Sequence, residues 1–281
     1  MKFPLGYIGV GLMGGPMVRR LVSLDWRVRA YDIVPERSGV ASPAEVARGA
    51  EVVILNLPTN EAVEQAVFGP QGLASAMTKE QLLVDLSTIP VDACRSHAAA
   101  LLAKTGCRWV DAPVSGGPPA VEAGTLTVMA GGEPADFKRL APLMRDIAAR
   151  YTLMGAVGAG LAAKMVNQLI VGVGQAMLAE SVALCAKAGI DAVHIPDCLA
   201  GGYADSNLLK AYWPRMVARD FAPRGYVRQM LKDLEMVNGW AGELKASAPL
   251  LAQAMSVYRL AASLGYSELD SSAVVKVYAP D

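Results

Sequence analysis

The sequence predicts an α/β fold whose N-terminal part is a doubly wound parallel sheet, followed by an all-α C-terminal domain. Two observations support this prediction. Short apolar runs alternate with helix-like segments up to about residue 155, whereas the chain from Leu161 onward has successive helical patterns and few strand-like runs. The glycine-rich stretch GAVGAG separates the two patterns. We therefore expect two domains, over residues 1–160 and 161–281.

The predicted strands of the first domain are short and apolar. In chain order they are YIGV, RVRAYD, VVILNL, LLVDLS, RWVDAPV, LTVMAGG and YTLMG. Charged, Ala-rich segments such as 42–50 and 90–106 lie between them and are typical of helices. Strands that alternate with helices indicate βαβ crossovers and a mostly parallel sheet. The run VVILNL is apolar except at Asn56, as expected for a strand covered on both faces.

The second domain is predicted to be helical. Residues 161–189 form one long helical pattern that ends at Gly189. This pattern is apolar nearly all round, so we expect the helix to be buried between domains or subunits. Further helices are predicted in 213–220, 225–244 and 249–265.

Composition narrows the range of functions. The chain has 281 residues, 53% of them hydrophobic, and Lys plus Arg balances Asp plus Glu at 26 each. Without a basic stripe or an acidic tail, neither nucleic acid nor a membrane surface is the expected partner, so we expect a small-molecule ligand. No signal peptide and no apolar run of about 20 residues is visible, so no membrane span is expected. The four widely spaced cysteines are typical of reduced, mostly buried thiols in a cytoplasmic protein.

The first glycines have the spacing of a dinucleotide-binding loop. Gly9, Gly11 and Gly14 form G-x-G-x-x-G directly after an apolar run and open a helix-like segment. Gly11 would let a pyrophosphate approach the backbone, Gly14 would let the helix pack close to the strand, and the helix N-terminus would supply free N–H groups. Asp32 ends the second apolar run, where an acid accepts the ribose hydroxyls and repels a 2′-phosphate. These features favour a Rossmann domain that binds NAD rather than NADP.

The stretch DAPVSGG is a second candidate. It places Ser115, Gly116 and Gly117 directly after a predicted strand, where backbone N–H groups and a hydroxyl could form a concavity for an anion such as a carboxylate. The alternative is an ordinary glycine-rich loop.

The stretch GAGLAAKMVNQ is the third. Lys164, Asn167 and Gln168 have the spacing i, i+3 and i+4, so they share one face of the long helix. A lysine in an Ala-rich, apolar helix start is costly to bury unless it has a task. The alternative is a lysine whose charged end extends to solvent.

These motifs together resemble those of the β-hydroxyacid dehydrogenases, which include 3-hydroxyisobutyrate dehydrogenases and tartronate semialdehyde reductases. The resemblance covers nearly the whole chain through GYIGVGLMGGPM, DAPVSGG with AGTLTVMAGG, GAGLAAKMVNQ, and LKDLEMV. It implies an N-terminal Rossmann domain, an all-helical C-terminal domain, and assembly as a homodimer or homotetramer. It also implies an NAD(P)-dependent oxidoreductase that interconverts a short 3-hydroxy acid and its semialdehyde or keto form by hydride transfer.

The resemblance implies roles for individual residues. Lys164 would be the general acid/base that takes the hydroxyl proton in oxidation and returns it in reduction. The substrate would be bound by Ser115, Gly116, Gly117, Asn167 and Gln168. The cofactor would be bound by Gly9, Gly11, Leu12, Met13, Gly14, Asp32, Leu57, Pro58, Thr88 and Lys232. No cluster of metal ligands is visible, and no metal is expected.

Departures from the family pattern leave the substrate open. Gln168 stands where Asn is common, Ala120 stands where Gly is common, and Gly225 replaces an aromatic residue. Arg224 and Arg228 could bind a second acidic group of the substrate, or could be solvated surface residues.

Three other functions are compatible with parts of this pattern. A 6-phosphogluconate dehydrogenase shares the lysine, but has His at the position of Asn167 and a longer chain. An imine reductase-like enzyme typically lacks the lysine. A non-catalytic nucleotide-binding or interaction protein could retain the same fold.

Overall fold

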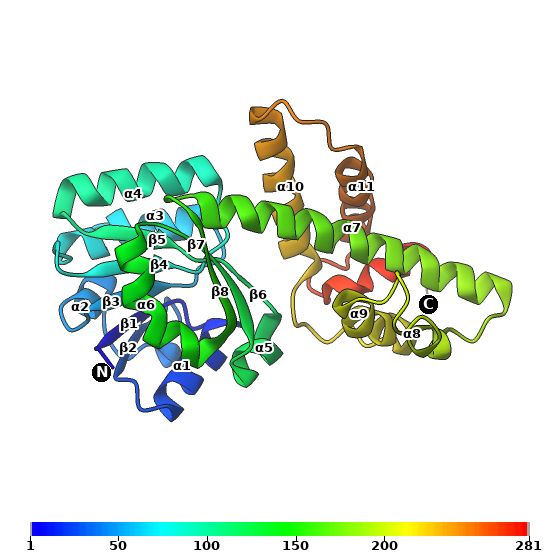
Figure 1. Cartoon of the computed structure of the whole chain (residues 1–281), viewed down its shortest axis with the longest axis horizontal. Coiled ribbons are helices and arrows are strands. Elements are labelled where there is room, and N and C mark those ends of the chain that lie inside the picture. Colours follow the sequence, from blue (N-terminus) through cyan, green and yellow to red (C-terminus); the bar gives the residue numbers. More distant parts are fainter. Residues whose placement is uncertain (1, 280–281) are drawn as a thin grey trace. The chain divides into compact units, whose positions relative to one another are not determined.

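The first unit of the chain is built around an eight-stranded sheet (Figure 1). The computed structural model describes residues 2–279. The strands are β1 (Leu5–Ile8), β2 (Val28–Tyr31), β3 (Val52–Leu55), β4 (Leu82–Asp85), β5 (Arg108–Asp111), β6 (Val114–Ser115), β7 (Leu126–Gly131) and β8 (Ala148–Gly155). Every predicted apolar run overlaps one of these strands, although β1 and β8 begin before the runs YIGV and YTLMG. The run RWVDAPV contains β5 and the first residue of β6, which is a separate strand.

The strand order explains where a ligand site forms. The order is β2-β1-β3-β4-β5-β7-β6, and β8 pairs with β7. Strands β2 to β5 pair in parallel, as predicted, whereas β7 runs antiparallel to β5 and β6. The chain changes direction across the sheet at β1, which lies between β2 and β3. In sheets of this kind, ligands bind at the carboxyl ends of the strands beside such a switch point.

Six helices accompany the sheet. They are α1 (Gly14–Ser23), α2 (Pro43–Ala47), α3 (Asn60–Phe68), α4 (Val91–Thr105), α5 (Gly117–Ala123) and α6 (Pro134–Ile147), with short 3-10 turns η1 (Pro35–Arg37) and η2 (Leu73–Ser75). The predicted helices at 42–50 and 90–106 are confirmed by α2 and α4. The α2 helix begins after Ser42, whose hydroxyl accepts the Glu45 N–H at 3.3 Å and so caps the first turn.

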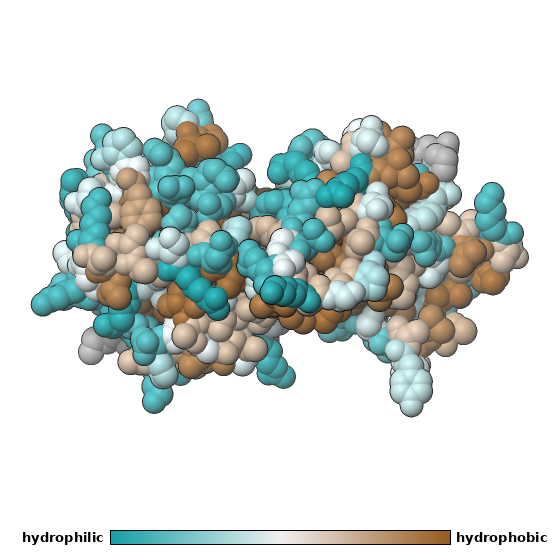
Figure 2. All heavy atoms as spheres, turned by 90° about the horizontal axis from the view of Figure 1, so that it is seen from above, coloured by the Kyte–Doolittle hydropathy of each residue, from teal (hydrophilic) through white to brown (hydrophobic). Residues whose placement is uncertain are grey.

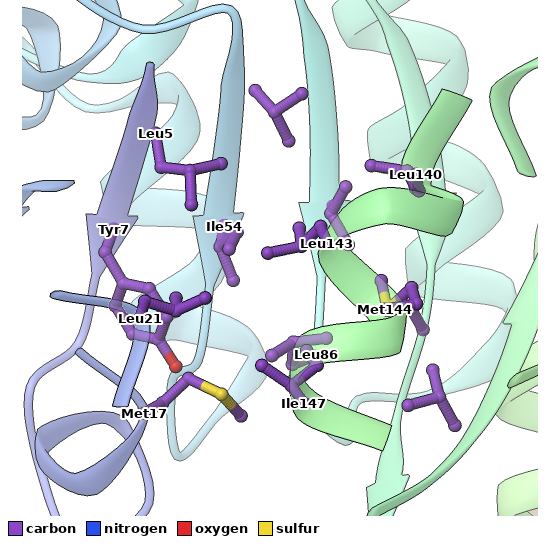
Figure 3. Packing of buried hydrophobic residues seen from close by; sticks show 14 of the residues in the cluster. Leu5, Tyr7, Met17, Leu21, Ile54, Leu86, Leu140, Leu143, Met144 and Ile147 are labelled. Atoms are coloured by element: carbon purple, nitrogen blue, oxygen red, sulfur yellow. The ribbon is translucent and has the colours of Figure 1, made fainter. Parts of the chain in front are cut away.

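One face of the sheet packs against α1 and α6. Figure 3 shows Leu5 and Tyr7 of β1 and Ile54 of β3 beside side chains of both helices. Because side chains alternate along a strand, the intervening residues of β3 lie on the opposite face. All four residues of β3 are buried, which confirms the prediction of a strand covered on both faces.

The second unit is helical. Its elements are α7 (Ala159–Ala188), η3 (Ala192–His194), α8 (Ile195–Cys198), α9 (Asn207–Ala218), α10 (Val227–Glu243), α11 (Pro249–Ser263) and η4 (Ser271–Val277). The long predicted helix is confirmed as α7, and its predicted end is confirmed by Gly189 with φ of +68°. Helices α10 and α11 lie side by side (Figure 1), and both pack against η4.

The division between the two units falls inside α7. The compact units are Met1–Lys164 and Met165–Asp281, whereas the boundary predicted from the sequence, 160/161, falls in the first turn of the same helix. Lys164 therefore belongs to the first unit, and Asn167 and Gln168 belong to the second.

Helix α7 is less buried than its composition predicts. Ile170, Met177 and Leu184 are exposed by 64%, 56% and 68%. Figure 2 shows brown hydrophobic residues on the surface among hydrophilic ones. In contrast to the expectation of no membrane span, α7 is long and apolar enough to cross a membrane by length and composition. This is weak evidence, because the core helix of a protein without any span can pass the same test.

The cysteines have no disulfide partner. Cys94, Cys107 and Cys185 are buried and Cys198 is exposed, and all four are free. The prediction of mostly buried, unbridged thiols is confirmed.

Candidate functional site

The loop after β1 has the geometry of a phosphate-binding turn. A Cβ at Gly14 would collide with the carbonyl oxygen of Gly9, so α1 approaches β1 as closely as the backbone allows. A Cβ at Gly11 would meet nothing within 4 Å, so this part of the loop faces open space. Helix α1 begins directly after this loop, so its first N–H groups, which have no partner within the helix, lie at the loop. The close packing of helix on strand predicted for Gly14 is therefore present, whereas the pyrophosphate contact of Gly11 stays a prediction.

Asp32 is held against this loop. Its carboxylate accepts the Val10 N–H at 2.6 Å through Oδ2 and the Val34 N–H at 2.9 Å through Oδ1. Val10 lies between the first two glycines of the motif. The structure thus places the acid that follows β2 directly beside the glycine loop, and two backbone hydrogen bonds fix its orientation.

The ends of β3 and β4 lie next to this loop, because β3 is the neighbour of β1. Leu57 donates its N–H to the Ser87 hydroxyl at 2.9 Å, and Ser87 donates its own N–H to Asp85 at 2.9 Å. Leu57 and Thr88 are half-buried, and Pro58 is exposed. The residues predicted to contact the cofactor, Leu57, Pro58 and Thr88, therefore lie just beyond the carboxyl ends of two adjacent parallel strands.

The SGG loop begins where β6 ends. Ser115 pairs with Thr127 of β7, and the next two residues leave the sheet with φ of +132° at Gly116 and +68° at Gly117. Positive φ at two successive positions is costly for residues with a Cβ, which explains the paired glycines. Gly116 is exposed, and α5 begins at Gly117, so the N–H groups of these two glycines and the Ser115 hydroxyl belong to one turn.

Lys164 reaches this loop from α7. Its Nζ donates to the carbonyl oxygen of Val114 at 2.8 Å, and the residue is only 7% exposed. Val114 directly precedes Ser115. The structure therefore brings together two motifs that are 50 residues apart in the sequence, and the buried amine is at the start of the SGG turn. The alternative of a lysine extending to solvent is wrong.

The other predicted site residues form a separate group in the helical unit. Asn167 donates its amide to Gln168 at 2.8 Å, and Gln168 donates to Asp233 of α10 at 2.6 Å. Lys232 Nζ lies 3.2 Å from the other Asp233 oxygen. A chain of polar contacts thus links the amide of Asn167 to the KDL motif, with Gln168 and Asp233 buried.

Several other polar residues have partners away from these groups. Arg228 pairs with Glu268 at 2.7 Å, and Arg224 lies 3.9 Å from Asp220. His97 contacts Asn60 at 3.0 Å, and burial lowers its pKa. His194 is on the surface near Asp191. Within residues 2–279, no group of three or more His, Cys, Asp or Glu side chains could hold a metal ion.

Two buried acids that contact these groups, Asp111 and Asp233, are not among the residues predicted from the sequence. Asp111 receives the Gly158 and Leu161 N–H groups at the start of α7, and Asp233 receives the Gln168 amide. A signal existed for Asp111, because an acid ends the apolar run RWVD. Its partners are backbone groups, which no side-chain pattern reveals.

Comparisons with known proteins cover the whole of this architecture. The family model described as the NAD binding domain of 6-phosphogluconate dehydrogenase matches residues 4–155. A second model, "NAD-binding of NADP-dependent 3-hydroxyisobutyrate dehydrogenase", matches residues 158–278. The Escherichia coli 2-hydroxy-3-oxopropionate reductase is 32% identical over 281 residues, which cover 97% of this chain and 96% of that protein. The chain belongs to the β-hydroxyacid dehydrogenase family.

Other members of the family agree with this assignment. A Pseudomonas aeruginosa 3-hydroxyisobutyrate dehydrogenase is 34% identical over 98% of both chains. The solved structure of a Mycobacterium tuberculosis 3-hydroxyisobutyrate dehydrogenase with L-serine has a TM-score of 0.87 and 30% identity, and covers 99% of this chain and 100% of that one. The predicted family, Rossmann fold and NAD-binding character of this dehydrogenase family member are thereby confirmed.

Proposed function

We propose that this family member interconverts a short 3-hydroxy acid and its semialdehyde or keto form, with NAD as the preferred cofactor and Lys164 as the general acid/base. Membership of the family makes the chain an NAD(P)-dependent oxidoreductase. The observation that carries the role of Lys164 is the 2.8 Å contact from its Nζ to Val114. A buried amine beside a turn that can bind an anion suits proton transfer to a bound hydroxy acid.

The SGG turn and Lys164 are proposed to bind different groups of the substrate. The Ser115 hydroxyl and the N–H groups of Gly116 and Gly117 would bind the carboxylate, since a turn with successive positive φ values exposes N–H groups to an anion. Lys164 would then lie near the substrate hydroxyl, because its Nζ contacts the residue before Ser115. In oxidation it accepts the hydroxyl proton, and in reduction it returns the proton to the carbonyl oxygen.

Asn167 and Gln168 are proposed to orient the substrate. Asn167 follows Lys164 by three residues on α7, so the two side chains share a helix face. The Gln168 amide is held by Asp233, and it in turn accepts from Asn167. Because the side-chain NH₂ of Asn167 binds Gln168, the side-chain oxygen of Asn167 is proposed to accept a hydrogen bond from the substrate.

The residues present fit a dinucleotide. The open space at Gly11, the close approach at Gly14 and the start of α1 suit a pyrophosphate, flanked by Leu12 and Met13. The Asp32 carboxylate beside Val10 suits ribose hydroxyls and disfavours a 2′-phosphate. Leu57, Pro58, Thr88 and Lys232 are proposed to contact the rest of the cofactor. When bound, the nicotinamide accepts or donates the hydride.

The wider setting follows from the same proposal. A small hydroxy acid is the partner, and neither nucleic acid nor a membrane is required. The exposed Ile170, Met177 and Leu184 of α7 support assembly into a homodimer or homotetramer, because large apolar side chains on one helix are commonly covered in an assembly. We propose a cytoplasmic location, in keeping with the free thiols.

A cofactor assay tests the reaction. Purified protein is mixed with NAD or NADP and, in turn, 3-hydroxyisobutyrate, L-serine, D-glycerate or L-threonate, and formation of reduced nicotinamide is followed by absorbance. We expect reduction with at least one acid, faster with NAD, and loss of turnover in Lys164→Ala with cofactor binding retained. If the protein binds cofactor but is inactive with every acid and with the corresponding semialdehydes, the proposal is wrong.

A further inference from the structure

We propose that Asp111 is a positioning residue that fixes the start of α7 and thereby holds Lys164 at the SGG loop. Asp111 ends β5, is completely buried, and is the first residue of the DAPVSGG stretch, four residues before Ser115. The inference rests on the proposed role of Lys164. It adds a residue that does not touch the substrate but determines where the reacting amine lies.

The carboxylate of Asp111 binds the first turn of α7 through both oxygens. Oδ1 accepts the Gly158 N–H at 2.7 Å, and Oδ2 accepts the Leu161 N–H at 2.8 Å. The first N–H groups of a helix have no partner within the helix, and a negative charge at this end is favourable. Lys164 follows Leu161 by three residues, less than one turn further along α7.

The surroundings of this carboxylate leave little room for movement. A Cβ at Gly131 would collide with Oδ1, and a Cβ at Gly160 would lie 2.9 Å from Oδ2 and collide with the Met129 carbonyl oxygen. Strand β7 and the helix start therefore approach the carboxylate directly through their backbones. Any shift of the acid must move α7 or the sheet.

Helix α7 is thus attached at two points of one short segment. Asp111 holds the helix backbone, and Val114, three residues later, accepts the Lys164 amine at 2.8 Å. The ends of this segment are fixed by the sheet, because β5 pairs with β4 and β6 pairs with β7. Both attachments therefore share one rigid frame with Ser115, which immediately follows Val114.

A second buried acid, Asp85, lies beside Asp111 in the sheet but has different hydrogen-bond partners. Asp85 is the register partner of Asp111 on β4 and is equally buried, but one of its oxygens has no hydrogen-bond partner. Burial raises the pKa of both carboxyls, and this rise is opposed by hydrogen bonds from Ser87 at Asp85 and from the Gly158 and Leu161 N–H groups at Asp111. Asp111 therefore differs from Asp85 in that both of its oxygens accept backbone N–H groups at the helix start.

The test uses Asp111→Asn, which keeps the size of the side chain but cannot accept both N–H groups. The substrate is the most active acid of the panel, with and without deuterium at the carbinol carbon. We expect kcat to fall roughly 10-fold to 100-fold, since small misplacements of a catalytic group have effects of that size. The deuterium isotope effect on kcat should rise because hydride transfer becomes rate-limiting, and the Kd for NADH should stay within about twofold.

Asp136→Asn is the matched control. Asp136 is also a buried acid of the first unit, 1% exposed, but it binds Arg108 at 2.6 Å and not α7. This variant should lose stability while kcat and the isotope effect remain as in the wild type. If circular dichroism shows that Asp111→Asn does not fold, Asp111→Glu is used in its place. Glutamate keeps both acceptor oxygens but displaces them by one methylene, so Asp111→Glu should show the same loss of kcat.

The outcomes separate the inference from the function beneath it. An inactive Lys164→Ala together with a slow Asp111 variant and a raised isotope effect supports the inference. An Asp111 variant with wild-type kcat, or with reduced kcat and an unchanged isotope effect, overturns it while the role of Lys164 stands. A Lys164→Ala variant that turns over normally overturns the role of Lys164 and the inference with it.

Discussion

Two glycines of the cofactor loop, replaced singly by alanine, should have opposite effects on stability and on binding. At Gly14 the new Cβ would collide with the Gly9 carbonyl oxygen and lie 3.1 Å from the ring of Tyr7, which is fully buried. Neither neighbour can give way without moving β1. At Gly11 the new Cβ would enter open space, so the fold accommodates it.

The magnitudes follow from these contacts. Overpacking against rigid neighbours costs about 1–3 kcal/mol, and the contact with a backbone oxygen places Gly14→Ala at the upper end. The better helix propensity of alanine returns about 1 kcal/mol, which leaves a net loss of about 2 kcal/mol. For a protein of this size, Tm should fall by roughly 4–8 °C. Gly11→Ala should change stability by less than about 0.5 kcal/mol.

Thermal unfolding without cofactor and fluorescence titration with NADH measure the two effects. Gly11→Ala should weaken NADH binding at least tenfold, about 1.4 kcal/mol, because its methyl group occupies the space left for a pyrophosphate. An unchanged Tm for Gly14→Ala would contradict the packing argument. Unchanged NADH affinity for Gly11→Ala would contradict the assignment of the loop.

Three further substitutions test other parts of the structure. Burial raises the pKa of Asp85 to about 7, so between about pH 4 and 7 the carboxyl is ionised more readily in the unfolded chain, and the free energy of unfolding falls as pH rises through this range. In urea unfolding, Asp85→Asn should remove this pH dependence and raise the free energy of unfolding by a few kcal/mol at pH 8. A variant whose free energy of unfolding changes with pH as that of the wild type does would refute the argument. Asp32→Asn should reduce the preference for NAD over NADP at least tenfold in kcat/KM, because the charge that repels a 2′-phosphate is lost; an unaltered ratio would argue against its ribose contact. Asp233→Ala should raise KM for the hydroxy acid about tenfold or more, since the buried Gln168 amide loses a charged acceptor; an unchanged KM would show that this contact does not support substrate binding.

Much of the fold was predictable because it depends on local patterns. The apolar run that contains β3 is long enough only for a strand. Helix α7 ends at Gly189 because glycine adopts a φ of +68° more readily than residues with a Cβ. The separate strand β6 was not predictable. It has two residues and exists because β7 pairs with it, which is a tertiary effect.

The site was predictable at its side chains but not at its backbone partners. The motifs named Ser115 and Lys164, yet the acceptor that joins them is the Val114 carbonyl, and every residue has a carbonyl. The same limit hid Asp111, whose partners are N–H groups of α7. The link from Gln168 to Asp233 joins positions 65 residues apart, and spacing alone does not reveal it.

The most direct test of the central claim is chemical rescue of Lys164→Ala. Turnover of the active hydroxy acid with NAD is measured with increasing methylamine, at constant ionic strength and pH, after NADH titration has shown that cofactor binding is retained. If Lys164 is the general acid/base, the variant is inactive alone and regains activity in proportion to the concentration of free amine. Activity in the variant without amine would contradict the claim.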